Sequence, residues 1–443
     1  MTPRHVAVVG AGAAGLTAAL RAAEAGARVT LLNAHPRIGL KILMSGGTRC
    51  NVTHREVTER DYNGGSRNFV RRVLRAFTVE QTLEWFQTLG VALKLEETGK
   101  YFPVGDDAQV VLDALLAAVE RAGVEVQSGA RVVRLETPGE GAAAAAPRLR
   151  LGVQTVQESA AFGVGVAPIG QEAWPLPVAT PDRWLEADAL VMATGGLSFP
   201  RTGSDGVGYA LVTALGHSLE PPVPALTPLA ATDSLCRTAQ GVTVDVELTL
   251  RVGGPVAERV RGSLLFAHFG YTGPAALDLS RHWLRAGDTR ERLVTASFAP
   301  GDSAEAVHEW LKQASIESPR VSARRMLGRW IPERLAAELC REAGVGDGSV
   351  PVAQLPRVNR VRLVERLVSR PMPVSGTLGY EKAEVTAGGV RLDEVNPSTL
   401  ESRKAPGLYL CGEILDVEGR LGGFNFQWSW SSGTVAGRAA AST

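Results

Sequence analysis

The residues best placed to do chemistry in this chain are three glycines close to its start. They follow an apolar run at residues 5–9 with the spacing G-x-G-x-x-G, and an alanine- and leucine-rich stretch at 13–25 accompanies them. In a strand–turn–helix unit, glycines at this spacing permit the tight turn, let a pyrophosphate approach the backbone and let the helix pack on the strand. The free N–H groups of the helix then bind the phosphates. The pattern predicts a dinucleotide site formed by Gly10, Gly12, Ala13, Ala14 and Gly15.

The residue after the second expected strand decides how the adenosine ribose is held. That strand covers residues 28–32, and Asn33 follows it. An acidic side chain is usual at this place because a carboxylate accepts hydrogen bonds from ribose hydroxyls. The amide oxygen of Asn33 can also accept a hydrogen bond, but it carries no charge. We therefore expect Asn33 to contact the ribose and to hold it less tightly than a carboxylate would.

Further glycine-rich segments are suited to enclose a flavin. Residues 39–51 continue the first motif, residues 189–196 form a buried strand that stops at a glycine pair, and residues 407–427 contain a strand that ends in Gly412 and Glu413. A flavin needs groups that hold its ribityl chain and cover its ring. Glu413 can accept hydrogen bonds from ribityl hydroxyls, and the start of the terminal helix can face the ring edge where negative charge collects on reduction. The pattern indicates FAD.

The chain resembles the BaiN-like, or aminoacetone oxidase-like, FAD-dependent oxidoreductases along nearly its whole length. The segments that carry this resemblance are 10–15, 41–51, 193–196, 265–274, 376–379, 385–389 and 407–437. The family usually has glutamate where this chain has Asn33, and commonly glycine where it has Thr48. The resemblance implies cofactor contacts at Lys41, Ser45, Gly46, Arg49, Asn51, Ala193, Thr194, Gly195, Gly412, Glu413, Gly422, Gly423, Phe424 and Asn425.

The expected fold is α/β. The resemblance implies a Rossmann-type, glutathione-reductase-like FAD-binding domain with a parallel sheet, interrupted by a small β-barrel-like domain and a helical domain. Alternating runs between residues 130 and 190 add an antiparallel meander to this expectation. Within the first domain, residues 69–89 read as one amphipathic helix, and the alanine-rich tract 142–147 reads as a hairpin tip. The expected bounds are 1–219 and 374–443 for the FAD-binding domain, 220–302 with part of 366–385 for the β-barrel-like domain, and 303–365 for the helical domain.

Two basic residues are candidates for a direct part in catalysis. Lys41 and Arg49 could stabilise the anionic reduced flavin, and Arg49 is favoured because a guanidinium stays charged in a semi-buried site and donates in a fixed plane. The alternative is that either residue only holds a phosphate or caps a loop. The reactive centre would be the flavin N5. We expect an FAD-dependent oxidoreductase that moves hydride between a nicotinamide or organic donor and a small organic acceptor or oxygen.

The sequence contains fewer motifs for the electron donor and for the substrate than for FAD. No second dinucleotide fingerprint follows a strand, and the nearest glycine cluster, residues 203–208, contains Asp205, which would repel a pyrophosphate. NADH or NADPH would therefore visit the flavin transiently. One short aromatic stretch could either wall the substrate pocket or pack in a core; it contains Phe266, His268, Phe269 and Tyr271.

Two other functions stay open. Residues 320–370 contain eleven arginines against five acidic residues, and such a surface could bind RNA in an RNA-linked flavoprotein. An arginine-rich helical surface is more often simply solvated, and aromatic residues for base stacking are absent there beyond Trp330. Nucleic acid is therefore not the expected partner. The other alternative is a redox-sensing flavoprotein that does not turn over.

The composition excludes several classes of protein. With 47 basic and 46 acidic residues the net charge is +1, which gives no global attraction to nucleic acid or anionic membrane. No run of about 18 apolar residues could span a bilayer, and the early glycines would break the helix of a signal peptide. The four cysteines form no C-x-x-C pair, and the histidines lack metal-ligand spacing. We expect a cytoplasmic protein with a small-molecule substrate and no metal.

Overall fold

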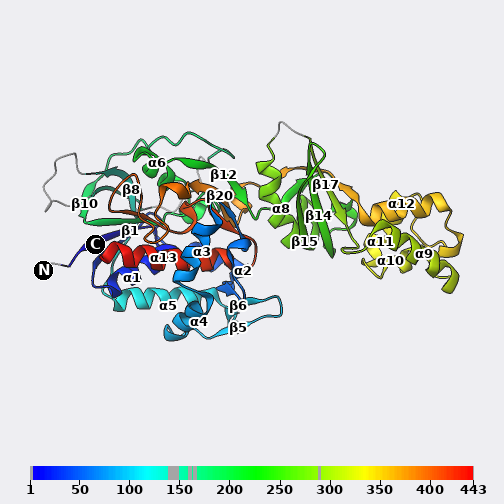
Figure 1. Ribbon diagram of the computed structural model, residues 1–443, viewed down its shortest axis with the longest axis horizontal. Helices are drawn as coiled ribbons and strands as arrows, with labels where there is room; N and C mark the ends of the chain where they lie inside the picture. Colours follow the sequence, from blue (N-terminus) through cyan, green and yellow to red (C-terminus); the bar gives the residue numbers. More distant parts are fainter. Residues whose placement is uncertain (1–2, 138–148, 158–161, 163–166, 288–290, 443) are drawn as a thin grey trace. The chain divides into compact units, whose positions relative to one another are not determined.

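The computed structural model describes residues 3–137, 149–157, 162, 167–287 and 291–442 (Figure 1). The chain divides into two compact units, one of residues 1–224 with 383–443 and the other of residues 225–382. The second unit holds both the segment expected to be β-barrel-like and the segment expected to be helical. The tract 142–147, expected to be a hairpin tip, lies outside the described residues.

A five-stranded parallel sheet organises the first unit. Its order is β21-β11-β1-β2-β7, and all of its strand pairs are parallel. The central strands are apolar and buried, as in sheets that helices cover on both faces. The strand order reverses at β1, the place where open α/β sheets bind ligands beyond the carboxyl ends of their strands. The bounds are β1 (His5–Val9), β2 (Arg28–Asn33), β7 (Glu125–Ser128), β11 (Ala189–Met192) and β21 (Leu408–Leu410).

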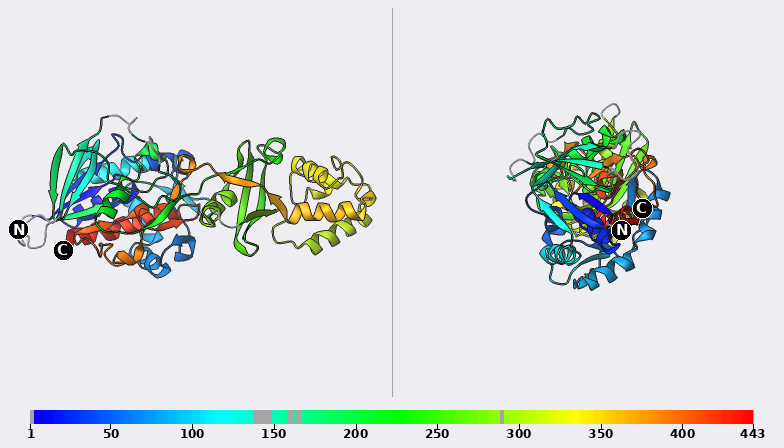
Figure 2. Two further views of the ribbon diagram at one scale, coloured as in Figure 1. Left: turned by 90° about the horizontal axis from the view of Figure 1, so that it is seen from above. Right: turned by 90° about the vertical axis from the view of Figure 1, so that its left-hand side faces the viewer.

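Helices pack around this sheet. α13 (Phe424–Ser442) runs along α1 (Ala13–Glu24), so the end of the described chain lies against its beginning (Figures 1 and 2). The single helix predicted over 69–89 is wrong, because a new helix starts at Thr78. Thr78 and Gln81 form a capping box, in which each side chain accepts a hydrogen bond from the other residue's backbone N–H. The other helices are α2 (Leu40–Thr48), α3 (Arg67–Ala76), α4 (Val79–Thr88), α5 (Ala108–Arg121) and α6 (Val207–Ala214).

Short antiparallel sheets complete the first unit. β9 pairs with β8 and β10, which confirms the expected meander. The remaining pairs are β3 with β6 and β6 with β5, β4 with β22, and β12 with β20. The bounds are β3 (Thr53–His54), β4 (Tyr62–Gly64), β5 (Leu93–Leu95), β6 (Lys100–Pro103), β8 (Ala130–Glu136), β9 (Leu149–Thr155), β10 (Arg183–Ala187), β12 (Leu219–Ala225), β20 (Val385–Val390) and β22 (Val417–Gly419).

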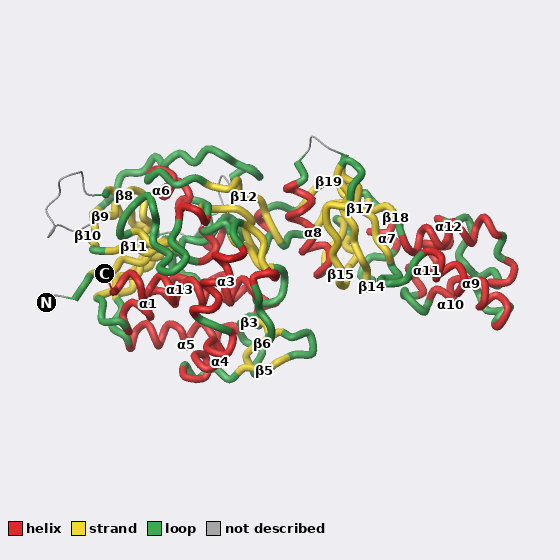
Figure 3. Tube along the Cα trace, in the orientation of Figure 1, coloured by secondary structure: helices red, strands yellow, loops and turns green. Residues whose placement is uncertain are grey.

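The second unit combines an antiparallel sheet with helices (Figure 3). The sheet order is β18-β17-β14-β15-β16-β13-β19, and its two end strands do not pair with each other among the described residues. One core joins strands and helices: it includes Phe266 and Tyr271 from the sheet and Leu339 from α11. Phe266 and Tyr271 are therefore core residues, while His268 is exposed. The strands are β13 (Leu229–Ala231), β14 (Thr243–Val252), β15 (Val256–Ala267), β16 (Gly270–Thr272), β17 (Arg292–Ser297), β18 (Arg370–Met372) and β19 (Val374–Thr377).

The arginine-rich segment, residues 320–370, contains three of the helices described in this unit, α10 (Ala323–Leu327), α11 (Glu333–Glu342) and α12 (Arg357–Val368). The other α-helices described are α7 (Leu235–Thr238), α8 (Pro274–Arg285) and α9 (Ala304–Glu317). One arginine of the segment is buried: Arg370 forms ion pairs with Asp233 at 2.6 Å and with Glu342 at 2.7 Å. It links a sheet strand to α11 and is not part of a basic surface.

A buried cluster of polar side chains joins distant segments of the first unit. His217 Nδ1 donates to Glu394 Oε2 at 3.0 Å in the tautomer whose Nε2 accepts from Ser402 Oγ at 2.7 Å. The Ser218 N–H also donates to Glu394 Oε2, and Lys404 Nζ lies 3.7 Å from its other oxygen. Burial lowers the pKa of His217. Burial alone would raise the pKa of Glu394, but the hydrogen bonds from Ser218 and His217 outweigh it and lower that pKa.

We expect the free energy of unfolding to fall as the pH drops below the ordinary histidine pKa of 6.5. Because the pKa of His217 is lower in the folded than in the unfolded chain, the unfolded chain binds more protons in this window, and acid favours unfolding. Urea unfolding at about pH 7.5 and about pH 5.5 measures the effect, and His217→Gln should weaken it. An equal pH dependence in the variant and the wild type would contradict this role of His217.

Candidate cofactor site

The turn between β1 and α1 leaves no room for side chains at two of its glycines. A Cβ at Gly10 would lie 2.3 Å from the carbonyl oxygen of Ala193, and a Cβ at Gly15 would lie 1.7 Å from the carbonyl oxygen of Gly10. Gly10 also has a φ of 102°. A Cβ at Gly12, in contrast, would meet no atom within 4 Å. The turn is closed toward the protein and open at Gly12, where a pyrophosphate needs room.

The start of α1 presents backbone N–H groups at this turn. Gly12 is the N-cap and no side chain caps the helix. The Leu16 N–H donates to the carbonyl oxygen of Gly12 at 2.9 Å. The N–H groups of Ala13, Ala14 and Gly15 precede that bond, so they have no partner inside the helix. Together with the positive end of the helix dipole they can bind an anion.

The protein itself uses most of the hydrogen-bonding capacity of Asn33. Its Oδ1 accepts from the Ala11 N–H at 3.1 Å. Its Nδ2 donates to the carbonyl oxygen of His35 at 2.6 Å and to that of Arg37 at 3.3 Å. Asn33 therefore fastens the glycine turn to the loop after β2. One acceptor position of Oδ1 stays available for a ribose hydroxyl.

α2 unwinds at the residues where the family resemblance implies cofactor contacts. Ser45 has a ψ of 150°, and Gly46 and Gly47 have φ values of 57° and 68°. Thr48 follows with a φ of 70°. This left-handed conformation is costly for a β-branched residue, which gives a physical reason why glycine suits the Thr48 position. Ser45 and Gly46 therefore lie in an irregular turn and not in a regular helix.

Arg49 has partners of its own in the protein. Its Nη1 lies 2.7 Å from Glu96 Oε1 and 3.4 Å from Asp106 Oδ1. Its guanidinium carbon lies 4.0 Å from the centre of the Phe102 ring. The hydrogen bond to Glu96 raises the pKa of Arg49. These contacts support the alternative in which Arg49 fastens a loop, and its role toward a reduced flavin stays a prediction.

Lys41 and Glu413 form an ion pair, with 2.8 Å between Nζ and Oε2 and with side chains that are 26% and 18% exposed. Two further residues complete this group. Ser198 Oγ accepts from Lys41 Nζ at 2.7 Å, and the Thr386 N–H donates to Glu413 Oε1 at 3.0 Å. Sequence patterns predict a role for neither residue: Ser198 lies outside the segments that carry the family resemblance, and Thr386 lies in segment 385–389, 188 positions away, to which no chemical role was attached.

Two buried side-chain oxygens among the residues expected to contact the cofactor have no hydrogen-bond partner, Asn51 Oδ1 and Thr194 Oγ1. Thr194 Oγ1 lies against Gly208 of α6, where a Cβ would be 1.9 Å away. Buried polar atoms are normally paired, so the Asn51 oxygen fits a site whose remaining partner is a ligand. A Cβ at Gly423 would lie 2.7 Å from Asn51 Oδ1, so the glycine allows this oxygen to lie close to the chain. With the open space at Gly12, the Asn51 oxygen fits the FAD that the sequence predicts.

Five other residues expected to contact the cofactor lie in turns or directly after a strand. Gly195, Gly412 and Gly422 all have positive φ values, of 73°, 77° and 137°. Ala193 and Thr194 directly follow β11, beside the glycine turn. Whether these residues touch a cofactor stays a prediction.

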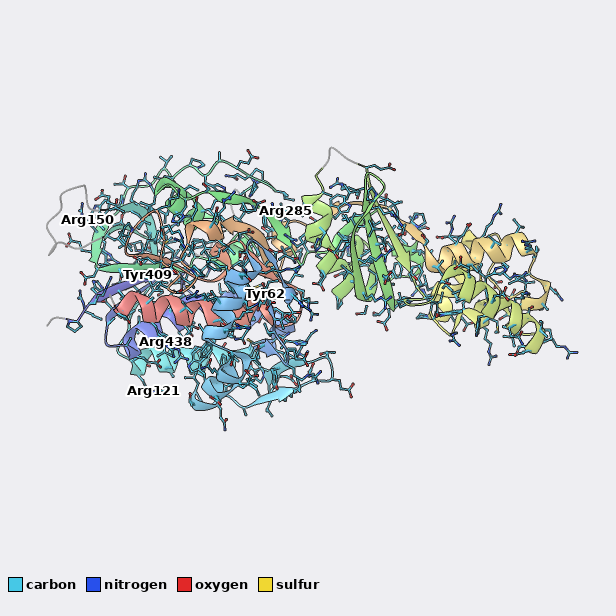
Figure 4. All side chains as sticks on the ribbon, in the orientation of Figure 1. Tyr62, Arg121, Arg150, Arg285, Tyr409 and Arg438 are labelled. Atoms are coloured by element: carbon cyan, nitrogen blue, oxygen red, sulfur yellow. The ribbon has the colours of Figure 1, made fainter. Side chains whose placement is uncertain are left out.

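Phe424 and Asn425 hold the chain at the start of α13. The Phe424 ring stacks on His54 with 4.9 Å between ring centres, and its carbonyl oxygen accepts from the Tyr62 hydroxyl at 2.7 Å (Figure 4 labels Tyr62). The Asn425 amide bonds both backbone groups of Gly419, at 2.8 and 2.9 Å. Asn425 therefore shapes the loop before α13, and its capacity to bind a cofactor is largely used.

The described residues contain neither a cluster of metal ligands nor a helix that could span a membrane. No group of three or more His, Cys, Asp or Glu residues there could hold a metal ion. None of the helices described is both long enough and apolar enough to cross a bilayer.

Comparison with known proteins gives full-length matches. The family model described as HI0933-like protein Rossmann domain matches residues 4–151 and 166–439. The chain is 32% identical over 440 residues to 3-dehydro-bile acid delta(4,6)-reductase of Clostridium scindens, and the match covers 99% of each chain. It is 31% and 32% identical to the ribosomal RNA dihydrouridine synthases of Haemophilus influenzae and Escherichia coli, with 96% of this chain and 95% of each relative covered.

Gly12→Val should abolish FAD binding without unfolding the protein. The Cβ of the new side chain would meet no protein atom within 4 Å, and the side chain would fill the place of the pyrophosphate. Absorbance of the purified variant and its urea midpoint measure the two effects. Gly15→Val is the contrasting variant, because its side chain would collide with the Gly10 carbonyl and should prevent folding. A folded Gly12→Val protein that retains FAD would contradict the site.

Asn33→Asp should destabilise the protein by about 1–3 kcal/mol, because a carboxylate has no hydrogen to donate to the carbonyl oxygens of His35 and Arg37. Affinity for FAD should not rise, although the added charge alone would favour the ribose hydroxyls. Urea unfolding and an FAD titration of the apoprotein measure both quantities. A variant as stable as the wild type, with tighter FAD binding, would refute this account of Asn33.

Proposed function

The chain belongs to the HI0933-like, or BaiN-like, family of FAD-dependent oxidoreductases with a Rossmann domain, and from this premise we propose that it reduces a carbon–carbon double bond conjugated to a carbonyl group. The full-length match to the bile acid reductase carries the proposal. The name of that relative states reduction of double bonds in a 3-dehydro bile acid, where the 3-oxo group and the double bonds are conjugated. The substrate class proposed for this chain is a small conjugated enone.

The residues of this chain would hold and orient the cofactor. The α1 N-terminus would bind the pyrophosphate, Asn33 the ribose, and the Lys41–Glu413 pair the groups nearer the flavin. FAD, when bound and reduced, would supply a hydride to the carbon β to the carbonyl, and a proton at the α carbon would complete the addition of two hydrogens. The protein must exclude water from this place and keep the acceptor against the ring.

NADH or NADPH is the electron donor that we propose, as a transient visitor to the flavin. Asp205, in the glycine cluster nearest to a second fingerprint, forms a hydrogen-bonded ion pair with Arg131 at 2.5 Å. That ion pair offsets the repulsion that Asp205 would exert on a pyrophosphate. The support for one dinucleotide site is that no second fingerprint follows a strand. A cytoplasmic location is also proposed, supported by four buried cysteines that are all free.

A second candidate is reduction of a uracil base in RNA, which the printed names of two relatives favour. The double bond of uracil is conjugated to a carbonyl group, so the chemistry would be the same. The arginine-rich segment supports it only in part. Arg324, Arg341 and Arg366 have carboxylate partners, and Arg370 is buried. Arg357 and Arg362, exposed on α12, form no ion pair in the described part of the chain. A small-molecule substrate remains the first candidate.

An anaerobic reoxidation experiment tests the proposal. The FAD-loaded protein is reduced with NADH or NADPH and then mixed with a 3-oxo-4-ene steroid acid, with its saturated 3-oxo analogue, or with a uridine-rich hairpin RNA. We expect fast return of the oxidised flavin spectrum with the enone and none with the saturated ketone. Reoxidation by the RNA alone would favour the second candidate. A protein that is reduced but reoxidised by neither acceptor would contradict both and would fit a redox sensor.

A further inference from the structure

We propose that Ser198 and Thr386 are positioning residues, which hold Glu413 and Lys41 in the arrangement that binds FAD. The inference rests on the proposed function, because it assumes that FAD binds to the first unit. It assigns a role to Ser198, which lies outside the sequence motifs, and to Thr386, whose segment 385–389 had no role attached to it.

Four segments of the first unit meet at the Glu413 carboxylate. Lys41 comes from α2, Ser198 from the loop after β11, Thr386 from β20, and Glu413 from η7, a short helix at Gly412–Ile414. Lys41, Ser198 and Glu413 contact one another across 157 to 372 positions of the chain, and Thr386 contacts Glu413 across 27. Such contacts form only after the sheet has folded. They therefore set the place of the carboxylate relative to the whole unit.

Ser198 lies between the two charges. Its Oγ accepts from Lys41 Nζ at 2.7 Å and lies 3.0 Å from Glu413 Oε1, to which its hydroxyl can donate. The side chain of Ser198 is fully buried. A partly buried carboxylate needs donors that replace its lost hydration, and this hydroxyl can supply one to Glu413. Lys41 gains a second acceptor that fixes the direction of its ammonium group.

Thr386 fixes both the loop and the carboxylate. Its Oγ1 accepts from the backbone N–H groups of Leu197 and Ser198, at 2.8 and 3.2 Å, and its own N–H donates to Glu413 Oε1 at 3.0 Å. Space around these atoms is minimal. A Cβ at Gly196 would lie 2.4 Å from Thr386 Oγ1 and 2.7 Å from Glu413 Oε1. The glycine lets the loop approach closely enough for the hydroxyl to bind it.

The hydrogen bonds leave one acceptor and one donor unused. A charged carboxylate has about four acceptor positions; here Oε1 uses two, for Ser198 and Thr386, and Oε2 uses one, for Lys41. The Lys41 ammonium group has three N–H donors, and two are used. Because both side chains remain partly exposed, the free acceptor and donor can serve the cofactor. A ribityl hydroxyl for Glu413 and an anionic cofactor group for Lys41 fit this pair.

The experiment is a double-mutant cycle on FAD affinity with Ser198→Ala, Glu413→Gln and the double variant. Apoprotein is titrated with FAD, and flavin fluorescence gives the dissociation constant. Ser198→Ala should weaken FAD binding about tenfold, the effect of about one charge-assisted hydrogen bond. If Ser198 acts through Glu413, it should have almost no effect in the Glu413→Gln background.

Conservative variants separate positioning from folding. Thr386→Ser keeps the hydroxyl and should retain wild-type FAD affinity, whereas Thr386→Val should weaken binding or fail to fold. Ser280→Ala is the matched control, because Ser280 is a fully buried, hydrogen-bonded serine of the second unit. It should leave the FAD dissociation constant unchanged. The urea midpoint of each apoprotein shows whether a lower affinity merely reflects a less stable fold.

Two outcomes would overturn the inference. One is wild-type FAD affinity in Ser198→Ala. The other is an equal loss of affinity in the wild-type and Glu413→Gln backgrounds, which would mean that Ser198 does not act through the carboxylate. If the wild-type apoprotein binds no FAD at all, the proposed function fails instead, so the two failures are distinct.

Discussion

The site depends on the close approach of three backbone segments: the β1–α1 turn, the end of β11 and the start of α1. The Ala193 and Gly10 carbonyl oxygens fill the places that side chains at Gly10 and Gly15 would need. Only glycine fits there, and only because it does can α1 aim its first N–H groups past Gly12 into open space. A packing constraint thus leaves the start of α1 open to an anion. The carboxyl end of β11 also brings Thr194 and the loop with Ser198 to the same edge of the sheet.

The charged groups around this edge divide into two kinds. Arg49 is bound by Glu96, Asp106 and Phe102, which together use much of its capacity and fasten a hairpin. Lys41 and Glu413 are bound too, but each keeps one unused hydrogen-bonding position. The same distinction separates Asn51, whose buried oxygen has no partner, from Asn425, whose amide closes a loop. Unused capacity, more than residue type, indicates which groups can receive a cofactor.

Much of this fold could be predicted from local sequence patterns. The apolar runs at 5–9 and 28–32 and the glycine spacing between them predicted β1, α1 and β2. Alternating runs between residues 130 and 190 predicted the meander, and the family resemblance predicted the Rossmann-type domain. The apolar periodicity of residues 69–89 predicted one helix, but the capping box of Thr78 and Gln81 begins a second helix within that pattern. Ser198 and Thr386 could not be predicted, because Ser198 lies 157 and 215 positions from Lys41 and Glu413, and Thr386 binds the loop of Ser198 from 188 positions away. Likewise, only the folded core shows that Phe266 and Tyr271 are interior residues.

We propose that the first unit binds FAD at the open position beside Gly12. Calorimetric titration of the purified wild-type apoprotein with FAD, followed by the visible spectrum of the complex, tests this directly. We expect saturable binding of one FAD per chain and the spectrum of a protein-bound oxidised flavin. A folded wild-type protein that neither carries a flavin nor binds added FAD would contradict it.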